Sequence, residues 1–222
     1  MKIPSTELPE TIEDTVLERN NPRFLDLTKH QIFIDTTGNS KNYKSIISWK
    51  ESDLDKALIS ASLKELGVEI KDKNIDTYNF PIHYISLRKL NNEFVLLDPC
   101  DGIDPRFAIK KNAFVFYGPL ESYVEVITKL VRISKNKIKL ELKTHKSLSS
   151  DQRSILEIER IKDFLYVMTY QNEKNKKEYY LTTVDYAKDF DVVVNHCPTM
   201  KMPAIIDRLD NFKGNEIIEV VE

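Results

Sequence analysis

The sequence has few of the residues on which several common function classes depend. It contains only 5 glycines in 222 residues, and neither GxGxxG nor GxxxxGK[ST] occurs, which excludes the usual Gly-rich phosphate loops. It has no apolar run of about 18 residues, so we expect no membrane-spanning segment. The formal net charge of -2 gives no general basic field, so we expect no nucleic-acid partner.

Cysteine is scarce as well. Cys100 and Cys197 permit at most one disulfide, and that number does not identify the redox compartment. The first residues, MKIPSTELPETIEDT, lack the apolar stretch of a signal peptide, so we expect a soluble chain of unknown location. A mature secreted or periplasmic form is equally compatible with this start. Prolines among acidic residues predict a loosely structured lead-in over residues 1–24.

One clear helix precedes many strands. The helix SDLDKALISASLKELG has Ser52 as its N-cap, Asp55 as the third residue of a capping box, and Gly67 at its end. Its apolar residues spread beyond one stripe, which predicts burial on more than one side. The strands expected from composition and alternation are QIFID, HYISLRKL, EFVLLD, AFVFYG, YVEVITKLVRI, KIKLELKTH, ILEIERI, FLYVMTYQ, EYYLTTVDY and FDVVVNH, with NEKNKKE as a charged hairpin loop.

This order of elements predicts an α+β fold in two parts. Residues 1–120 would form the core with its lead-in, and residues 121–222 would form a β-rich C-terminal module. The half-exposed alternation in KIKLELKTH predicts that strands of the second part pack through one face.

His83 and Asp98 form the most suggestive pair of polar residues. They lie at comparable distances from Asn91 and Asn92, the expected turn of a β-hairpin, so they can be neighbours across the ladder. A carboxylate beside an imidazole fixes its tautomer and stabilises its protonated form. We therefore expect a His83–Asp98 hydrogen bond, which would supply two members of a nucleophilic triad.

The third member is expected at the start of the helix, because a helix N-terminus favours a thiolate. The stretches DKALISASLKELGVE, IHYISLRKLNNEFVLLDPCDG and KNAFVF resemble the transglutaminase-like superfamily, the papain-related group with Cys, His and Asp, and its bacterial branch most of all. The resemblance covers about residues 45 to 118. It implies a buried helix packed on an antiparallel sheet, with His83 and Asp98 as catalytic residues.

The sequence departs from the family at the nucleophile. The family's cysteine position falls on Ser52, or on Asp53 if one residue is deleted, and a serine hydroxyl does not ionise as a thiol does. The resemblance therefore implies a catalytically inactive or impaired domain that serves as a binding or structural module, with a protein or peptide as a possible ligand. One alternative is an active acyltransferase or peptidase that uses Ser52 or Cys100. Another is a β-rich interaction protein in which the His–Asp spacing is accidental.

Other polar clusters are weaker candidates. His196 beside Cys197 suits neither a common zinc spacing nor a triad. Asp101 and Asp104, in DGIDP, have a calcium-loop interpretation, although Gly102 is equally typical of a plain turn. No cofactor and no metal are therefore expected.

Overall fold

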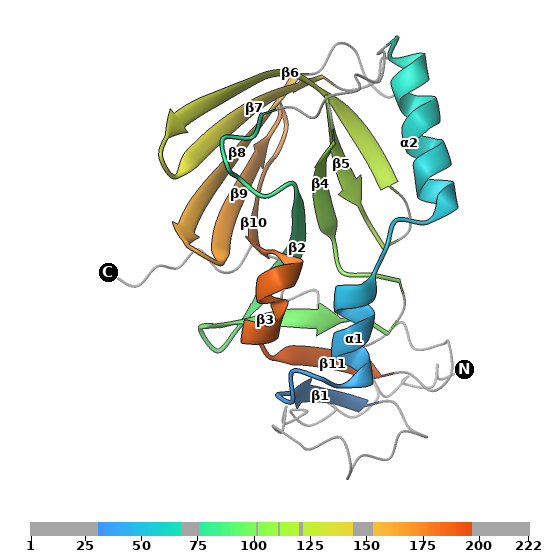
Figure 1. Ribbon diagram of the computed structural model, residues 1–222, viewed down its shortest axis with the longest axis vertical. Helices are drawn as coiled ribbons and strands as arrows, with labels where there is room; N and C mark the ends of the chain where they lie inside the picture. The colour runs from blue at the N-terminus through green and yellow to red at the C-terminus, as the bar shows by residue number, and fades with distance from the viewer. Residues whose placement is uncertain are drawn as a thin grey trace, which may run out of the picture.

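The computed structural model describes residues 31–67, 76–100, 102–110, 112–119, 122–143 and 153–196. In these residues the protein is mostly β, with two short α-helices (Figure 1). The elements are β1 (Gln31–Asp35), α1 (Lys41–Ser48), α2 (Asp53–Glu65), β2 (His83–Leu90), β3 (Glu93–Asp98), β4 (Arg106–Lys110), β5 (Ala113–Tyr117), β6 (Ser122–Ser134), β7 (Lys137–Lys143), β8 (Arg153–Lys162), β9 (Leu165–Gln171), β10 (Lys176–Thr182), the 3-10 helix η2 (Val184–Asp189) and β11 (Val192–His196).

Eight strands form a closed antiparallel barrel. Their order is β2-β10-β9-β8-β7-β6-β5-β4, and the pairing of β4 with β2 closes the ring. The barrel draws strands from both sides of residue 120, so the expected division into two parts falls between β5 and β6, which are neighbours in the same barrel.

A smaller sheet extends from one side of the barrel. Residues 88–90 of β2 pair with β3, whereas residues 83–85 pair with β4. Beyond β3 come β11, in a parallel pairing, and β1 at the edge. Helix α1 and η2 pack on this sheet below the barrel (Figure 1). Strand β2 therefore belongs to both sheets. Along the edge that does not pair with β10, its first half pairs with β4 and its second half pairs with β3.

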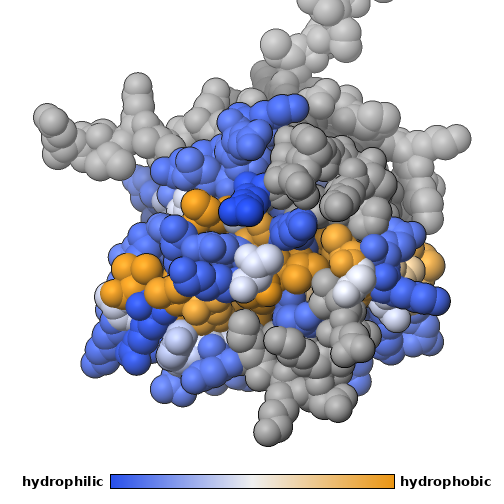
Figure 2. Space-filling model, turned by 90° about the horizontal axis from the view of Figure 1, so that it is seen from above, coloured by the Kyte–Doolittle hydropathy of each residue, from blue (hydrophilic) through white to orange (hydrophobic). Residues whose placement is uncertain are grey.

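Side chains fill the interior of the barrel. On β7, Ile138, Leu140 and Leu142 are fully buried and alternate with partly exposed residues, as the sequence predicted. Aromatic residues of β4 and β5, such as Phe107 and Phe114, fill the same space. Eight strands enclose a space just wide enough for side chains or one small ligand, and here side chains occupy it. Between the hydrophilic residues on the face seen in Figure 2, hydrophobic residues form an interrupted band.

Helix α2 begins as predicted, but it packs differently. Ser52 and Asp55 form the capping box, and Gly67 has a left-handed φ of +64° just after the helix. Only Ile59 and Leu63 are buried, against the outer wall of β5 and β6, while Leu54 is 69% exposed. The prediction of burial on more than one side is wrong, because the helix covers a barrel from outside and only one face of it meets protein.

The transglutaminase-like resemblance and the α+β class are therefore wrong for this chain. The described residues form a barrel with two short helices outside it, and they contain no helix buried within an antiparallel sheet. The expected strands beyond residue 120 are confirmed, with η2 replacing the end of the expected strand EYYLTTVDY. The loop expected at 172–178 is shorter, because β10 begins at Lys176. The lead-in at 1–24 lies outside the described residues.

Within the described part of the chain, no helix has the length and apolar character needed to cross a membrane. The same residues contain no group of three or more His, Cys, Asp or Glu side chains that is suited to a metal ion.

Candidate functional site

The structure does not bring the expected triad together. His83 lies opposite Ala108 of β4, whereas Asp98 lies opposite Val194 of β11. The Asn91–Asn92 turn is present, with positive φ at both residues, but the hairpin separates after three residue pairs. Among the described residues no hydrogen bond joins His83 to Asp98, so that prediction is wrong. Two residues at equal distances from a turn are neighbours only if the hairpin stays paired along its whole length, and this hairpin does not.

Asp98 has a different environment from the one expected. Burial raises the pKa of its carboxyl to about 6, and the charge of His196 opposes that rise. The carboxyl is at the end of β3, beside β11. It therefore belongs to the small sheet.

Ser52 is occupied as a helix cap. Its hydroxyl donates to Asp55 Oδ2 at 2.6 Å and accepts from the Asp55 N–H at 3.0 Å. Asp55 in turn accepts a hydrogen bond from Ser122 of β6 at 2.7 Å. These contacts explain a serine at this position without catalysis.

The remaining candidates also have structural roles. Cys100 is disulfide-bonded, so its sulfur is not a free nucleophile, and the chain's other cysteine, Cys197, lies outside the described residues. Asp104 is buried and pairs with Arg88 of β2. Asp101 lies outside the described residues, so the calcium interpretation rests on a carboxylate that already has an arginine partner.

A cleft of about 810 Å³ lies where the start of β2 meets β4, the α1–α2 linker and η2. It takes in one of the predicted residues, His83. Most of its other lining residues are aromatic or charged: Trp49, Lys50, Glu51, Phe80, Tyr84, Arg106, Phe107, Lys110, Tyr117, Tyr166, Asp185 and Tyr186. We take this cleft as the candidate functional site.

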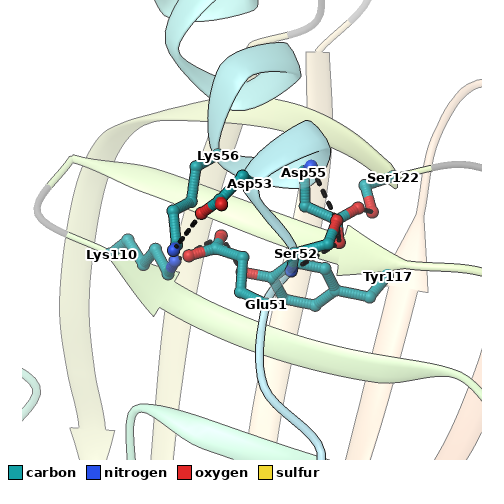
Figure 3. Close-up of polar contacts among 8 residues, drawn as sticks. All are labelled: Glu51, Ser52, Asp53, Asp55, Lys56, Lys110, Tyr117 and Ser122. Atoms are coloured by element: carbon teal, nitrogen blue, oxygen red, sulfur yellow. Dashed lines mark hydrogen bonds and ion pairs between the residues drawn. The ribbon is translucent and has the colours of Figure 1, made fainter.

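A polar network fixes the linker wall of the cleft. Glu51 Oε1 accepts hydrogen bonds from Lys110 Nζ at 2.5 Å and from the Tyr117 hydroxyl at 2.8 Å. Figure 3 shows Glu51 between these two side chains. Burial and the adjacent Glu51 carboxylate raise the pKa of Tyr117 well above its ordinary value, so it remains a hydrogen-bond donor. The network therefore holds the linker against β4 and β5.

Arg106 is the most buried charge of the cleft. Its guanidinium carbon lies 4.8 Å from the centroid of the Trp49 ring, and its Nη2 donates to the Ile46 carbonyl at 2.7 Å. Burial lowers the pKa of Arg106 to about 10, and Asp104 opposes that effect. Even so, it stays a cation at neutral pH, held by a ring and a carbonyl.

His83 is accessible at the cleft. Partial burial and the charge of Lys110 lower its pKa, and Glu51 opposes them. At neutral pH its imidazole is therefore mainly uncharged, and an added negative group nearby would favour its protonation.

Apart from His83, the main residues that build this cleft were not predicted from the sequence. The segment RFAIK alternates basic residues with Phe107 and Ile109, a pattern typical of a strand with one basic outer face. That signal would have identified β4 and placed Arg106 and Lys110 on one side. No local signal would have placed Trp49 over Arg106, because their contact joins separate elements.

Comparisons with known proteins assign no family. No family model matches the chain, and no curated protein matches it. Among solved structures, the crystal structure of Treponema pallidum Tp0751 (Pallilysin) aligns with 60% of this chain and 98% of its own at 7% identity, with a TM-score of 0.33. A likeness at that level assigns neither fold nor function.

Proposed function

We propose that the protein is a binding module that holds a small, largely apolar ligand in the cleft beside β2 and β4. One observation carries this proposal: a cleft of about 810 Å³ is walled largely by aromatic rings and has convergent polar groups at one side. Binding sites for small molecules typically have this size and this lining. The proposal keeps the binding role expected from the sequence and leaves out the acyl-transfer chemistry.

The walls of the cleft are fixed before a ligand arrives. The interior of the barrel is filled with side chains, and the Glu51 network ties the linker to β4 and β5. A preformed site loses little conformational entropy on binding, which favours affinity for a small ligand.

A small molecule matches the site better than a folded protein does. Three exposed apolar residues line the cleft, namely Ile82, Val184 and Tyr186. A stable protein interface needs roughly 800 Å² on each partner, which is much more than three side chains supply. The same three residues suit contact with the exposed part of a ligand seated in the cleft.

Trp49 provides a direct test, because it is the only tryptophan in the chain and lines the cleft. We expect the neutral probe 1-pyrenebutanol to bind saturably and to quench Trp49 emission by energy transfer. Ile82→Ala should weaken binding severalfold, whereas Ile133→Ala, at an exposed site outside the cleft, should not. The proposal fails if the probe does not bind saturably, or if the two variants weaken binding equally.

We also infer that the protein acts in an oxidising compartment. Cys100 is disulfide-bonded, and disulfides persist in secreted or periplasmic proteins far more often than in the cytosol. Thiol titration of denatured protein from its native compartment should find no free cysteine; two free thiols would refute the inference.

A further inference from the structure

Three basic side chains come from the same wall of the cleft. Arg106 and Lys110 alternate with the interior residues of β4, so both are on the outer face of the barrel. His83, on β2, lies opposite Ala108, which is midway between them on β4. All three basic residues line the cleft. The topology therefore gathers cationic groups at one place in a chain whose formal net charge is -2.

Arg106 lacks the contacting carboxylate that a buried cation normally has. It is 7% exposed, and among the described residues no carboxylate lies within ion-pair distance of its guanidinium. Its Nε is buried and has no hydrogen-bond partner there. Asp104 acts on Arg106 electrostatically, but its ion pair is with Arg88, so no contacting anion replaces the water that Arg106 loses on burial. An anionic group in the cleft would offset that loss.

Tyr84 adds a second unpartnered polar group to the same cleft. Its side chain is 2% exposed, and its hydroxyl has no hydrogen-bond partner among the described residues. A buried hydroxyl normally finds one. Tyr84 packs with Phe107 in the barrel interior, on the face opposite to Arg106, so its hydroxyl would meet a different part of a ligand from the carboxylate.

Of the basic residues on this wall, Lys110 is already paired with Glu51, whereas among the described residues no carboxylate contacts Arg106. The carboxylate of Glu51 is taken up by Lys110 and Tyr117. Asp185 is exposed on η2, a different wall of the cleft. Together with Lys50, the lining carries three permanent cations against these two carboxylates.

We propose that the cleft selects small organic acids, with an aromatic or aliphatic body along the ring-lined walls and one carboxylate toward Arg106, His83 and Lys110. This inference rests on the proposed binding function and adds the charge of the ligand to it. Arginine suits the role because its planar donors match carboxylate geometry and it is always charged.

A matched pair of probes tests separately whether the cleft binds a small ligand and whether it prefers an acid. 1-Pyrenebutyrate and 1-pyrenebutanol share one aromatic body and differ in the carboxylate. We expect the acid to bind about tenfold or more tightly than the alcohol, as a charge-assisted contact should produce. Saturable binding of both probes with equal affinity would overturn the inference and leave the proposed function intact. Binding of neither probe would overturn both.

Substitutions locate the preference. Arg106→Gln should bring the two dissociation constants together. Lys110→Gln should also reduce the preference for the acid, because the negative charge of Glu51 would then repel the carboxylate of the ligand. The control is Lys129→Gln on β6, another lysine paired with a glutamate, with Nζ 3.8 Å from Glu141. If Arg106→Gln does not fold, the comparison of Lys110→Gln with Lys129→Gln decides: equal preferences in the two variants contradict the inference.

The pH dependence gives a readout that a purely structural role would not change. Two charged groups face His83: Lys110 from β4 and Glu51 from the linker. A bound carboxylate favours protonated His83, so the acid should bind more tightly at about pH 5.5 than at about pH 8. His83→Gln should flatten this dependence. A pH dependence that persists in His83→Gln would contradict the placement of the carboxylate.

Discussion

The guanidinium of Arg106 lies against the ring of Trp49, with 4.8 Å between its central carbon and the ring centroid. This contact joins a barrel strand to the linker between α1 and α2. It also places a buried cation and the chain's only tryptophan at the wall of one cleft.

Arg106→Met should change the free energy of unfolding by less than about 1 kcal/mol. The variant loses a cation–π contact and a hydrogen bond to Ile46, but it also relieves the desolvation of a buried charge. Urea unfolding at neutral pH measures the difference. A loss above about 3 kcal/mol would mean that Arg106 is there for stability, in which case its burial would no longer point to a ligand.

Ser52→Ala should cost about 1 kcal/mol of stability, because the first turn of α2 loses its cap. Ser52→Thr should restore most of that loss, since threonine also caps. Binding of pyrenebutanol should be unchanged in both variants. Ser60→Ala, in the exposed middle of the same helix, is the control and should not destabilise. Loss of ligand binding without loss of stability would instead give Ser52 a functional role.

Asp98 should make the protein less stable as pH rises. The pKa of its carboxyl is about 6 in the folded protein, above the ordinary value of 3.8, so the folded state binds the proton more tightly. Its stabilising contribution is complete below about pH 4 and is lost as pH rises through about 6. Asp98→Asn should therefore gain on the order of 1 kcal/mol at pH 7, after allowance for partial exposure.

The measurement for Asp98 is chemical unfolding of the wild type and the variant between about pH 4 and about pH 7.5. The difference between them should grow as pH rises. Asp163→Asn, in the exposed turn between β8 and β9, should show no such trend. A constant difference for Asp98→Asn would mean that its carboxyl is not held protonated by burial.

Reduction of the disulfide at Cys100 should lower the free energy of unfolding by about 2–4 kcal/mol, as removal of a native cross-link usually does. Thermal unfolding with and without dithiothreitol measures the effect. The change should be absent in Cys100→Ser, which lacks the bond from the start. An unchanged melting temperature on full reduction would show that the bond adds nothing to the fold.

The sequence predicted local structure better than it predicted contacts between distant elements. The capping box at Ser52, the Asn91–Asn92 turn and the alternation of β7 depend on neighbouring residues, and all three are confirmed. The burial of α2 and the His83–Asp98 contact depend on distant strands. Leu54 is exposed because the barrel meets the opposite side of the helix, and His83 faces β4 because β3 leaves β2 early.

The candidate site was predicted only in part. His83 lies in the cleft, whereas Ser52 and Asp98 have other roles. Arg106 and Lys110 share the outer face of β4, but His83 joins them only when β2 pairs with β4, and Trp49 only when the linker packs on β4. A contact between strands separated by a loop leaves no periodic signal in the sequence, so such a site emerges only from the fold.

Chemical-shift mapping by NMR locates the binding site residue by residue. Backbone amide resonances of the isotope-labelled protein would be followed during titration with 1-pyrenebutanol. We expect the largest shifts to fall together at residues 79–85, 106–110 and 183–186, and at the Trp49 indole N–H. Shifts confined to the outer faces of β7, β8 and β9, with Trp49 unaffected, would contradict the claim that this cleft is the binding site.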